Sequence, residues 1–371
     1  MPRSYKVTRH IGKQGYIELE AKWQQMADSA GSHFLHYPSW FKAYLFALED
    51  SPESVVFFAF HRDDQLVAVI PLKHKVKYLD ERFRIKLSYS AWELFYPSEM
   101  GVCDASLERD KVSKSLIKAL TEELNNYIRW DAVETLYIPQ QSSFYQLLCE
   151  SSSFLTKPSH PSKYLETTAD YDTCMSRFSK KFRKNLRRKL NNLEKQGQYH
   201  FEFITEKAAL AGAFQNFLAV EGSGWKGDEG TSIAQQPNAL NYYESLLDGY
   251  GKAGQAAIHL LWLNKKCIGA QFAVHAGSTL YLLKIGYDEA YAPLSPGFLL
   301  VDQLLKTACQ REDINRISFV TGTQWMDVWK PSVETVYNGY YFNRTLTGLT
   351  LNIAMRLFER IKPFLNRNRD K

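Results

Sequence analysis

The amino-acid sequence contains one order of elements twice, and this repeat limits the folds open to the chain. Segment 57–72, FFAFHRDDQLVAVIPL, has two apolar runs around a polar turn at Arg62 to Gln65, which predicts a β-hairpin. Segment 259–274, HLLWLNKKCIGAQFAV, has the same pattern around a turn at Asn264 to Lys266 and aligns without a gap. Leu66 and Ala68 then match Ile268 and Ala270. We therefore expect two domains of one architecture.

The elements that follow each hairpin extend the repeat. An amphipathic helix is expected at 112–124 and again at 297–309, and a strand follows each helix, at 133–138 and at 316–320. This order predicts an α/β (α+β) fold in which each domain has a mixed, largely antiparallel sheet flanked by helices. Pro158, Pro161 and several serines place the boundary near Pro158 to Tyr171, giving domains 1–160 and 161–371. Chance similarity between generic hairpins is the alternative explanation.

Composition narrows the class of protein. Of 371 residues, 45% are hydrophobic and 23% are charged, as in ordinary globular proteins. The first residues, MPRSYKVTRHIGKQGY, lack the apolar run of a secretory signal, and no apolar stretch is long enough to span a membrane, so a cytoplasmic location is expected. The five cysteines form no CxxC pair and the histidines have no ligand spacing, so we expect reduced thiols and no metal site.

The strongest charge cluster lies on an expected helix at 176–196. Its apolar positions recur every three or four residues, and Gly197 offers a stop; they are Phe178, Phe182, Leu186, Leu190 and Leu193. Seven of the ten residues in 180–189 are Lys or Arg. Three interpretations remain open: a solvated face, a contact with the phosphates of a cofactor or acidic substrate, or nucleic-acid binding. The two phenylalanines belong to the apolar stripe, so exposed stacking rings are missing and nucleic acid is disfavoured.

The stretch 280–300, LYLLKIGYDEAYAPLSPGFLL, predicts a strand that leads through a polar turn into a new helix. A helix start has unpaired N–H groups and the positive end of the helix dipole, so it can bind an anion. Ser295 is expected to cap the helix and Pro296 to occupy its first turn. Gly297 lacks a side chain where a phosphate would approach.

Several motifs of the second half together resemble a known family. They are KKFRKNLRRKLNNLEKQG, GWKG at 224–227, IGAQFAVH, GYDEAYAPLSPG, and SFVTG before a Trp-Lys pair. This set resembles the acetyltransferase domain of CelD-like GNAT proteins, which are associated with cellulose and other exopolysaccharide biosynthesis. The resemblance covers residues 165–335, and the first half resembles a diverged copy, as in the tandem domains of Fem-type aminoacyl transferases, which use aminoacyl-tRNA.

The resemblance implies a binding site for acetyl-CoA or another acyl-CoA. In GNAT enzymes the CoA pyrophosphate lies on the turn that opens a helix after the fourth strand, here Leu294, Ser295, Pro296, Gly297, Phe298 and Leu299. The usual Q/R-x-x-G-x-G/A pattern is missing, since Gly297 is the single glycine of the turn. The strand Leu282 to Gly286 would pair with the pantetheine amides, which places Lys284 and Ile285 beside the thioester.

Acyl transfer to an amine needs a neutral nucleophile and a proton for the leaving thiolate. Candidate bases are Glu221 and Asp288, and candidate acids are Tyr287 and Tyr291; each could equally be structural or solvated. Candidate contacts to the acceptor are Trp225, Lys226, Gln271, Trp329 and Lys330, with core packing as the alternative for the tryptophans.

The sequence predicts an acyl-CoA-dependent N-acyltransferase that acts directly on an amino group of a sugar or polysaccharide precursor. The alternatives are a Fem-like transferase that uses aminoacyl-tRNA and a non-catalytic glycan-binding module. The expected partner is a small amine or amino-sugar acceptor, with contact to a membrane surface or to polysaccharide machinery left open. The C-terminal segment 351–371, apolar first and then basic, is either a docking helix or an interfacial helix on anionic lipid.

Overall fold

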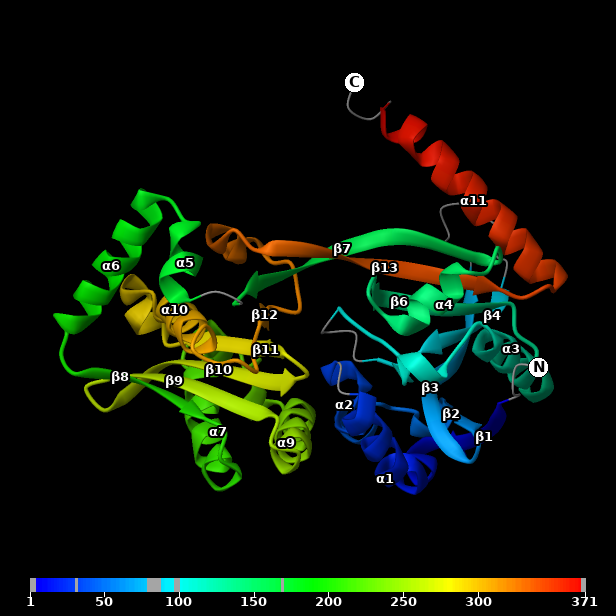
Figure 1. Cartoon of the computed structure of the whole chain (residues 1–371), viewed down its shortest axis with the longest axis horizontal. Helices are drawn as coiled ribbons and strands as arrows, with labels where there is room; N and C mark the ends of the chain where they lie inside the picture. The colour runs from blue at the N-terminus through cyan, green and yellow to red at the C-terminus, as the bar shows by residue number, and fades with distance from the viewer. Residues whose placement is uncertain (1–4, 31–32, 79–87, 97–100, 168–169, 368–371) are drawn as a thin grey trace. The chain divides into compact units, whose positions relative to one another are not determined.

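A computed structural model describes the chain except residues 1–4, 31–32, 79–87, 97–100, 168–169 and 368–371 (Figure 1). Contacts divide it into two compact units. Unit 1 contains Met1–Ala30, Ser51–His160 and Thr335–Lys371, and unit 2 contains Gly31–Asp50 and Pro161–Glu334. The units are therefore not two consecutive halves of the chain. Gly31–Asp50 lies in the first half of the sequence but belongs to unit 2, and Thr335–Lys371 lies in the second half but belongs to unit 1.

Unit 1 has a mixed sheet in the order β1-β2-β3-β4-β6-β13, with β5 paired to β3. Neighbours are antiparallel except β4 and β6, which are parallel. The strands are β1 (Lys6–Ile11), β2 (Val55–Arg62), β3 (Gln65–Tyr78), β4 (Ser88–Leu94), β5 (Ser106–Leu107), β6 (Ala132–Pro139) and β13 (Ser332–Phe342). The helices are α1 (Gly12–Ala30), α3 (Ser115–Tyr127), α4 (Ser143–Cys149) and α11 (Leu346–Arg367), with short η2 (Pro52–Ser54) and η5 (Arg109–Lys111).

Unit 2 repeats this sheet in the order β8-β9-β10-β11-β12-β7, with β11 and β12 as its parallel pair. Its strands are β7 (Phe154–Glu166), β8 (Tyr199–Ile204), β9 (Ala256–Leu263), β10 (Lys266–Ala276), β11 (Thr279–Tyr287) and β12 (Arg316–Ser318). Its helices are α2 (Pro38–Ala47), α5 (Tyr171–Ser176), α6 (Lys180–Glu194), α7 (Lys207–Glu221), α8 (Trp225–Asp228), α9 (Pro237–Lys252) and α10 (Pro296–Ala308). Short helical turns are η1 (Phe34–His36), η6 (Ile233–Gln235), η7 (Glu289–Leu294) and η8 (Gln324–Trp329).

The last strand of each sheet is exchanged along the chain. β7 follows β6 of unit 1 in the sequence, but its residues 164–166 pair with β12 of unit 2. β13 follows β12 of unit 2, but pairs with β6 of unit 1. Pro158 and Pro161, near which the sequence placed the domain boundary, therefore lie within strand β7.

Both predicted hairpins are present and have the same turn. Asp63 and Asp64 join β2 to β3, Asn264 and Lys265 join β9 to β10, and all four have positive φ angles between 48° and 67°. Two successive left-handed residues give a two-residue turn whose twist matches the strands. The predicted helices 112–124 and 297–309 correspond to α3 and α10 with shifts of a few residues, and the fold class is as predicted.

In unit 2, helices cover both faces of the sheet (Figure 1). Phe272 of β10 contacts the rings of Phe214 and Phe217 on α7 and Tyr243 on α9, so those helices cover one face. On the other face, a Cβ on Gly269 would lie 3.1 Å from Pro296 of α10. This close approach of α10 to β10 places the start of α10 directly over the sheet.

The segment Gly31–Asp50 packs into unit 2 through aromatic and small residues. The ring of Phe34 lies 4.6 Å from that of Tyr281 on β11, and the Tyr250 hydroxyl donates to the Phe34 carbonyl at 2.8 Å. A Cβ on Gly249 would lie 2.6 Å from the Ser39 side chain, so glycine lets α9 approach α2 closely. This segment is not among the features predicted from the sequence, because its packing partners on α9 and β11 lie about two hundred residues away.

A buried histidine in β9 makes the stability of unit 2 depend on pH. His259 is 2% exposed, its Nδ1 lies 3.1 Å from Gln271 Oε1, and burial lowers its pKa to about 4. In the unfolded chain the histidine side chain takes up a proton near pH 6.5, whereas in the native state His259 takes it up only near pH 4. The contribution of His259 is therefore complete above pH 6.5 and is lost as pH falls toward 4.

We expect this contribution to fall by about 2 kcal/mol between pH 7 and pH 5. Urea unfolding of the wild type and of His259→Gln, which cannot be protonated, measures it by circular dichroism. The stability difference between the two proteins should change by that amount in favour of the variant. An unchanged difference would show that His259 is protonated in the native state.

Candidate active site

Strand β11 loses one of its two neighbours halfway along its length. It pairs with β12 only from Thr279 to Tyr281, whereas its pairing with β10 continues to Tyr287. Just beyond β12, Val320 has a φ of 62°, a strained conformation for a β-branched residue that turns the chain away from β11. Among the residues that the structure describes, no strand pairs with this side of segment 282–287. Its backbone can therefore accept an extended amide-containing ligand.

A β-bulge changes the course of β11 at the same point. Phe272 pairs with Lys284 and Ala273 with Leu282, so Leu283 is the extra residue. A bulge increases the local twist and bends the strand, and such irregularities often lie beside active sites. The bulge and the turn at Val320 together open the sheet between β11 and the chain after β12.

The turn between β11 and α10 differs from the expected helix cap. Ser295 adopts a left-handed conformation with φ 58° and its side chain makes no capping hydrogen bond, so the predicted cap is wrong. Its carbonyl accepts from the Phe298 and Leu299 amides at 3.1 and 3.2 Å, and Pro296 has no N–H. Within this fully described turn, the Gly297 N–H is the amide left without a backbone acceptor.

The basic helix contributes a cation to this turn. Lys189 of α6 donates from Nζ to Ser295 Oγ and lies 5.3 Å from the centre of the Phe298 ring. Burial, and next the Arg188 guanidinium, lower the pKa of Lys189. An ammonium group at the positive end of α10 is repelled by the helix dipole, and a bound anion would remove that repulsion. Lys189 and the Gly297 amide are thus two donors at the start of α10 that an anion could accept from.

The corner around Gly297 has room for a small side chain. A Cβ placed there would meet Tyr287 at 3.7 Å and Ile285 at 3.9 Å, both ordinary contact distances. Ile285 and Gly297 are half-buried, and the Tyr287 side chain is exposed. The residues present therefore fit a diphosphate, with one backbone amide and one ammonium group as donors.

The two candidate carboxylates already have partners. Glu221, at the end of α7, is buried, with Lys226 Nζ 2.9 Å from one oxygen and the Ile233 amide 2.9 Å from the other. Asp288 is also buried, with Lys266 Nζ 2.8 Å from one oxygen and the Ala290 amide 3.0 Å from the other. Each carboxylate therefore holds a turn beside β11 in place.

Three of the remaining predicted contact residues are half-buried beside other side chains, and a fourth is exposed. Lys284 points toward α9, with Nζ 5.8 Å from the Tyr243 ring centre, and Tyr291 lies under Lys266 at 5.0 Å. Lys226 is held by Glu221, and Lys330 is exposed at the end of η8. The side chain of Trp225 lies outside the described residues.

Two predicted acceptor contacts are buried. Trp329 is 1% exposed and stacks on Phe298 at 4.6 Å, with Phe178 and Phe182 against its edges. Gln271 is fully buried, faces His259, and has no partner for Nε2 among the described residues. Trp329 therefore belongs to the core under the turn, together with Leu294, Pro296 and Leu299 at the helix start. Neither Trp329 nor Gln271 has exposed surface that an acceptor could contact.

Sequence reasoning treated the basic helix as one cluster and missed the special position of Lys189. Lys189 is three residues after Leu186 and four before Leu193, so it lies on the apolar face. That spacing was the available signal. The other predictions for this helix need adjustment: α6 begins at Lys180 after a Ser179 cap, so Phe178 lies outside it, and it ends at Glu194 before Gly197.

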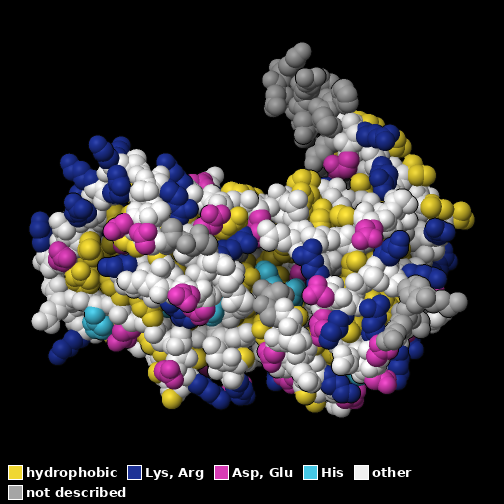
Figure 2. Space-filling model, in the orientation of Figure 1, with side chains coloured by type: hydrophobic (Ala, Val, Ile, Leu, Met, Phe, Trp, Pro, Cys, Tyr) yellow, Lys and Arg dark blue, Asp and Glu magenta, His cyan; other side chains and the backbone are white. Residues whose placement is uncertain are grey.

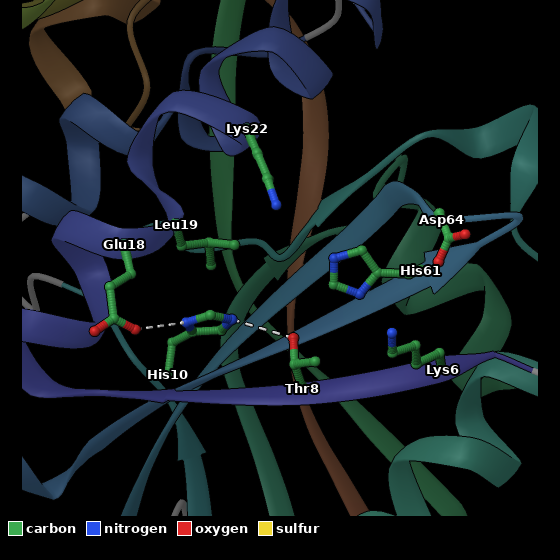
Figure 3. A pocket seen from close by; sticks show the side chains of 8 residues that line it. All are labelled: Lys6, Thr8, His10, Glu18, Leu19, Lys22, His61 and Asp64. Atoms are coloured by element: carbon green, nitrogen blue, oxygen red, sulfur yellow. Dashed lines mark hydrogen bonds and ion pairs between the residues drawn. The ribbon is translucent and has the colours of Figure 1, made fainter.

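Unit 1 has no counterpart of this corner in the part that the structure describes. Its equivalent connection, from β4 to α3, is residues 95–114 and contains β5 and η5, whereas β11 and α10 are joined by residues 288–295. Unit 1 instead has a hollow of about 310 Å³ between β1 and α1 (Figure 3). There His10 lies 3.1 Å from Thr8 and 3.5 Å from Glu18. The other lining residues are Lys6, Leu19, Lys22, His61 and Asp64. This hollow lies at a different position in the repeat.

The described residues contain no group of three or more His, Cys, Asp or Glu placed to hold a metal ion. Within the same described part of the chain, no helix is long and apolar enough to cross a membrane.

Part of the chain matches a known family, and the whole chain is similar in fold to solved structures. Residues 180–330 match the family described as "Acetyltransferase (GNAT) domain". The fold is similar to FemX, with 11% identity, a TM-score of 0.55, and coverage of 92% of this chain and 98% of that chain. It is also similar to L-PGS from Bacillus licheniformis, with 15% identity, a TM-score of 0.53, and coverage of 92% and 96%. No curated protein matches the sequence.

The chain is an acyltransferase with a GNAT-like fold. The family match falls on unit 2 and includes both Lys189 and the turn at Gly297, so both donors lie within the matched domain.

The burial of Trp329 can be tested against exposed Trp325, which lies in the same short helix. Trp329→Ala should destabilise unit 2 by about 3 kcal/mol or more, because it leaves a large cavity under α10. Trp325→Ala should cost less than about 1 kcal/mol, as surface substitutions do. Urea unfolding followed by circular dichroism compares the two. Similar stability of both variants would contradict a packing role for Trp329.

Proposed function

We propose that the chain is an acyl-CoA-dependent N-acyltransferase that transfers an acetyl group directly to an amino group of a sugar or polysaccharide precursor. The observation that carries this proposal is the position of Lys189 and the Gly297 amide at the end of an unpaired strand edge. Lys189 and the Gly297 amide are donors that a diphosphate needs, and the unpaired edge of β11 is what a pantetheine arm needs.

Each part of an acyl-CoA has a proposed contact in unit 2. The diphosphate would bind at residues 294–299, with Gly297 N–H and Lys189 Nζ as donors. The pantetheine amides would pair with the free edge of β11 from Leu282 to Gly286. The thioester would then lie near Lys284 and Ile285, at the bulge. Fixing both substrates along one strand supplies much of the rate acceleration, because it replaces a random encounter by a held geometry.

In the proposed transfer, the amine nitrogen forms a bond to the acyl carbon and gives up one proton, the carbon–sulfur bond breaks, and the thiolate takes up one proton, so the reaction neither gains nor loses protons overall. The carboxylates of Glu221 and Asp288 each have one oxygen paired with a lysine and the other bound to a backbone amide, so neither has an oxygen without a partner. We therefore assign them to positioning the loops around β11. Of the two candidate acids, Tyr287 is the more exposed, but its ring lies beside Gly297, so we propose its hydroxyl as a contact to the diphosphate.

The proposed acceptor is an amino sugar or glycan precursor. The resemblance to CelD-like proteins supports this class. Exposed Trp325 and Lys330 could contact a sugar ring and an acidic group, since aromatic faces and cations suit such ligands.

Binding of acetyl-CoA should depend on the space at Gly297. Isothermal titration is expected to detect binding to the wild type and none to Gly297→Trp, because the indole would fill the diphosphate position. Gly212→Trp is the control, since a Cβ at Gly212 meets nothing within 4 Å. No binding to the wild type at millimolar acetyl-CoA, or equal binding by Gly297→Trp, would reject the proposal.

Lys189 should contribute more than any neighbouring cation of α6. Lys189→Ala is expected to weaken acetyl-CoA binding by about tenfold or more, as a hydrogen bond to a charged group is worth about 1.5–3 kcal/mol. Lys184→Ala, which removes an exposed lysine from the same helix, should change the affinity less than about twofold. Equal effects of the two substitutions would indicate a general electrostatic contribution instead of a specific contact.

One observation favours a second function, an aminoacyl-tRNA-dependent transferase. The other six cations of α6 are exposed, and Lys and Arg side chains gather over this helix (Figure 2); they are Lys180, Lys181, Arg183, Lys184, Arg187 and Arg188. Electrophoretic mobility shift with tRNA at several salt concentrations separates the functions. Tight binding that weakens steeply with salt, together with no binding of acetyl-CoA, would favour the tRNA donor.

A further inference from the structure

Helix α11 is attached to unit 1 by one of its faces. Leu351 is buried against Phe342 and Ala132, with Met355 beside it. Arg356 donates to the carbonyls of Ser152 and Phe154 at 3.0 and 3.1 Å. These contacts fix the rotation of the helix about its axis.

The opposite face of α11 is apolar and exposed. Leu346, Leu349, Ile353, Leu357 and Ile361 are 86%, 46%, 61%, 49% and 49% exposed. Their spacing of three and then four residues places them on one side of the helix. Because the contacts of Leu351 and Met355 hold the other side, this stripe cannot turn inward to be buried. Exposed apolar surface of this extent marks an interaction site.

The charges around the stripe have one predominant sign. Glu359 is the single acidic residue in segment 344–361, and its carboxylate lies 4.0 Å from Lys157. Arg360 is exposed, and the sequence beyond Ile361 adds Lys362, Arg367, Arg369 and Lys371 against Asp370. Two copies of α11 would bring like charges together, whereas helix pairs normally alternate opposite charges beside the apolar seam. An anionic surface fits both the stripe and its charge.

We propose that α11 is an interfacial helix that binds the surface of an anionic lipid bilayer. The apolar stripe would enter the boundary between headgroups and acyl chains, and the basic residues would contact the lipid phosphates. Along the part of α11 that Figure 2 colours by residue type, hydrophobic side chains lie beside Lys and Arg, as this mode of binding requires. This proposal is independent of the acyl donor, since it concerns unit 1 and not the site at Gly297.

Flotation of the full chain with vesicles tests the proposal. We expect binding to vesicles of phosphatidylcholine with 30% phosphatidylglycerol, at least tenfold weaker binding to phosphatidylcholine alone, and weaker binding as salt rises. Ile353→Glu/Leu357→Glu should reduce binding to the anionic vesicles at least tenfold. Both positions are exposed, so this variant should keep its circular dichroism spectrum.

The control is Ile17→Glu/Val76→Glu, which adds the same charge at two exposed apolar positions of unit 1 outside α11. It should bind vesicles as the wild type does to within about twofold. Absent vesicle binding by the wild type, or equal losses in both variants, would overturn the proposal. So would sedimentation showing a dimer that Ile353→Glu/Leu357→Glu dissociates without any vesicle binding, since a second copy would then occupy the stripe.

Discussion

The parallel pairing of β11 with β12 ends after three residues on each strand, at Tyr281 and Ser318, and the rest of the site depends on this. Had the pairing continued, the backbone N–H and C=O groups of segment 282–287 would have hydrogen-bond partners within the sheet. No strand edge would then be left for a ligand. The left-handed Val320 and the bulge at Leu283 instead separate the two chains. A left-handed conformation is strained for β-branched Val320, and such strain persists only where the surrounding structure holds the residue. Here the pairing of β12 with β7 holds it. An open strand edge that leads directly to a helix start is the geometry that a long ligand with a diphosphate end requires.

Electrostatics joins this edge to the basic helix. Six of the cations on α6 face solvent, where screening makes each contribute little, but Lys189 lies on the apolar side and reaches the start of α10. Burial, and next the Arg188 guanidinium, lower the pKa of Lys189 and so disfavour its charged form. An anion would reverse this preference. The stacked Phe298 and Trp329 rings beneath the turn keep the position of α10 fixed while the ligand changes the charge above it.

Local patterns in the sequence predicted the hairpins, α3, α10 and the mixed sheets, because those features depend on periodicity and turn residues over short segments. The exchange of β7 and β13 could not be predicted, since both strands pair with partners far away in the sequence and neither has a distinctive composition. The position of the turn at Gly297 was correct, but Ser295 does not cap it, because its left-handed backbone directs the hydroxyl to Lys189. The pairing of Glu221 with Lys226, and of Asp288 with Lys266, likewise depends on contacts between loops that no spacing rule shows.

A crystal structure of the chain with bound CoA tests the central claim most directly. The account predicts the diphosphate within hydrogen-bond distance of Gly297 N–H and Lys189 Nζ, and the pantetheine arm paired with β11 between Leu282 and Gly286. CoA bound with its diphosphate on another element, or with β11 closed by protein backbone in the complex, would contradict it.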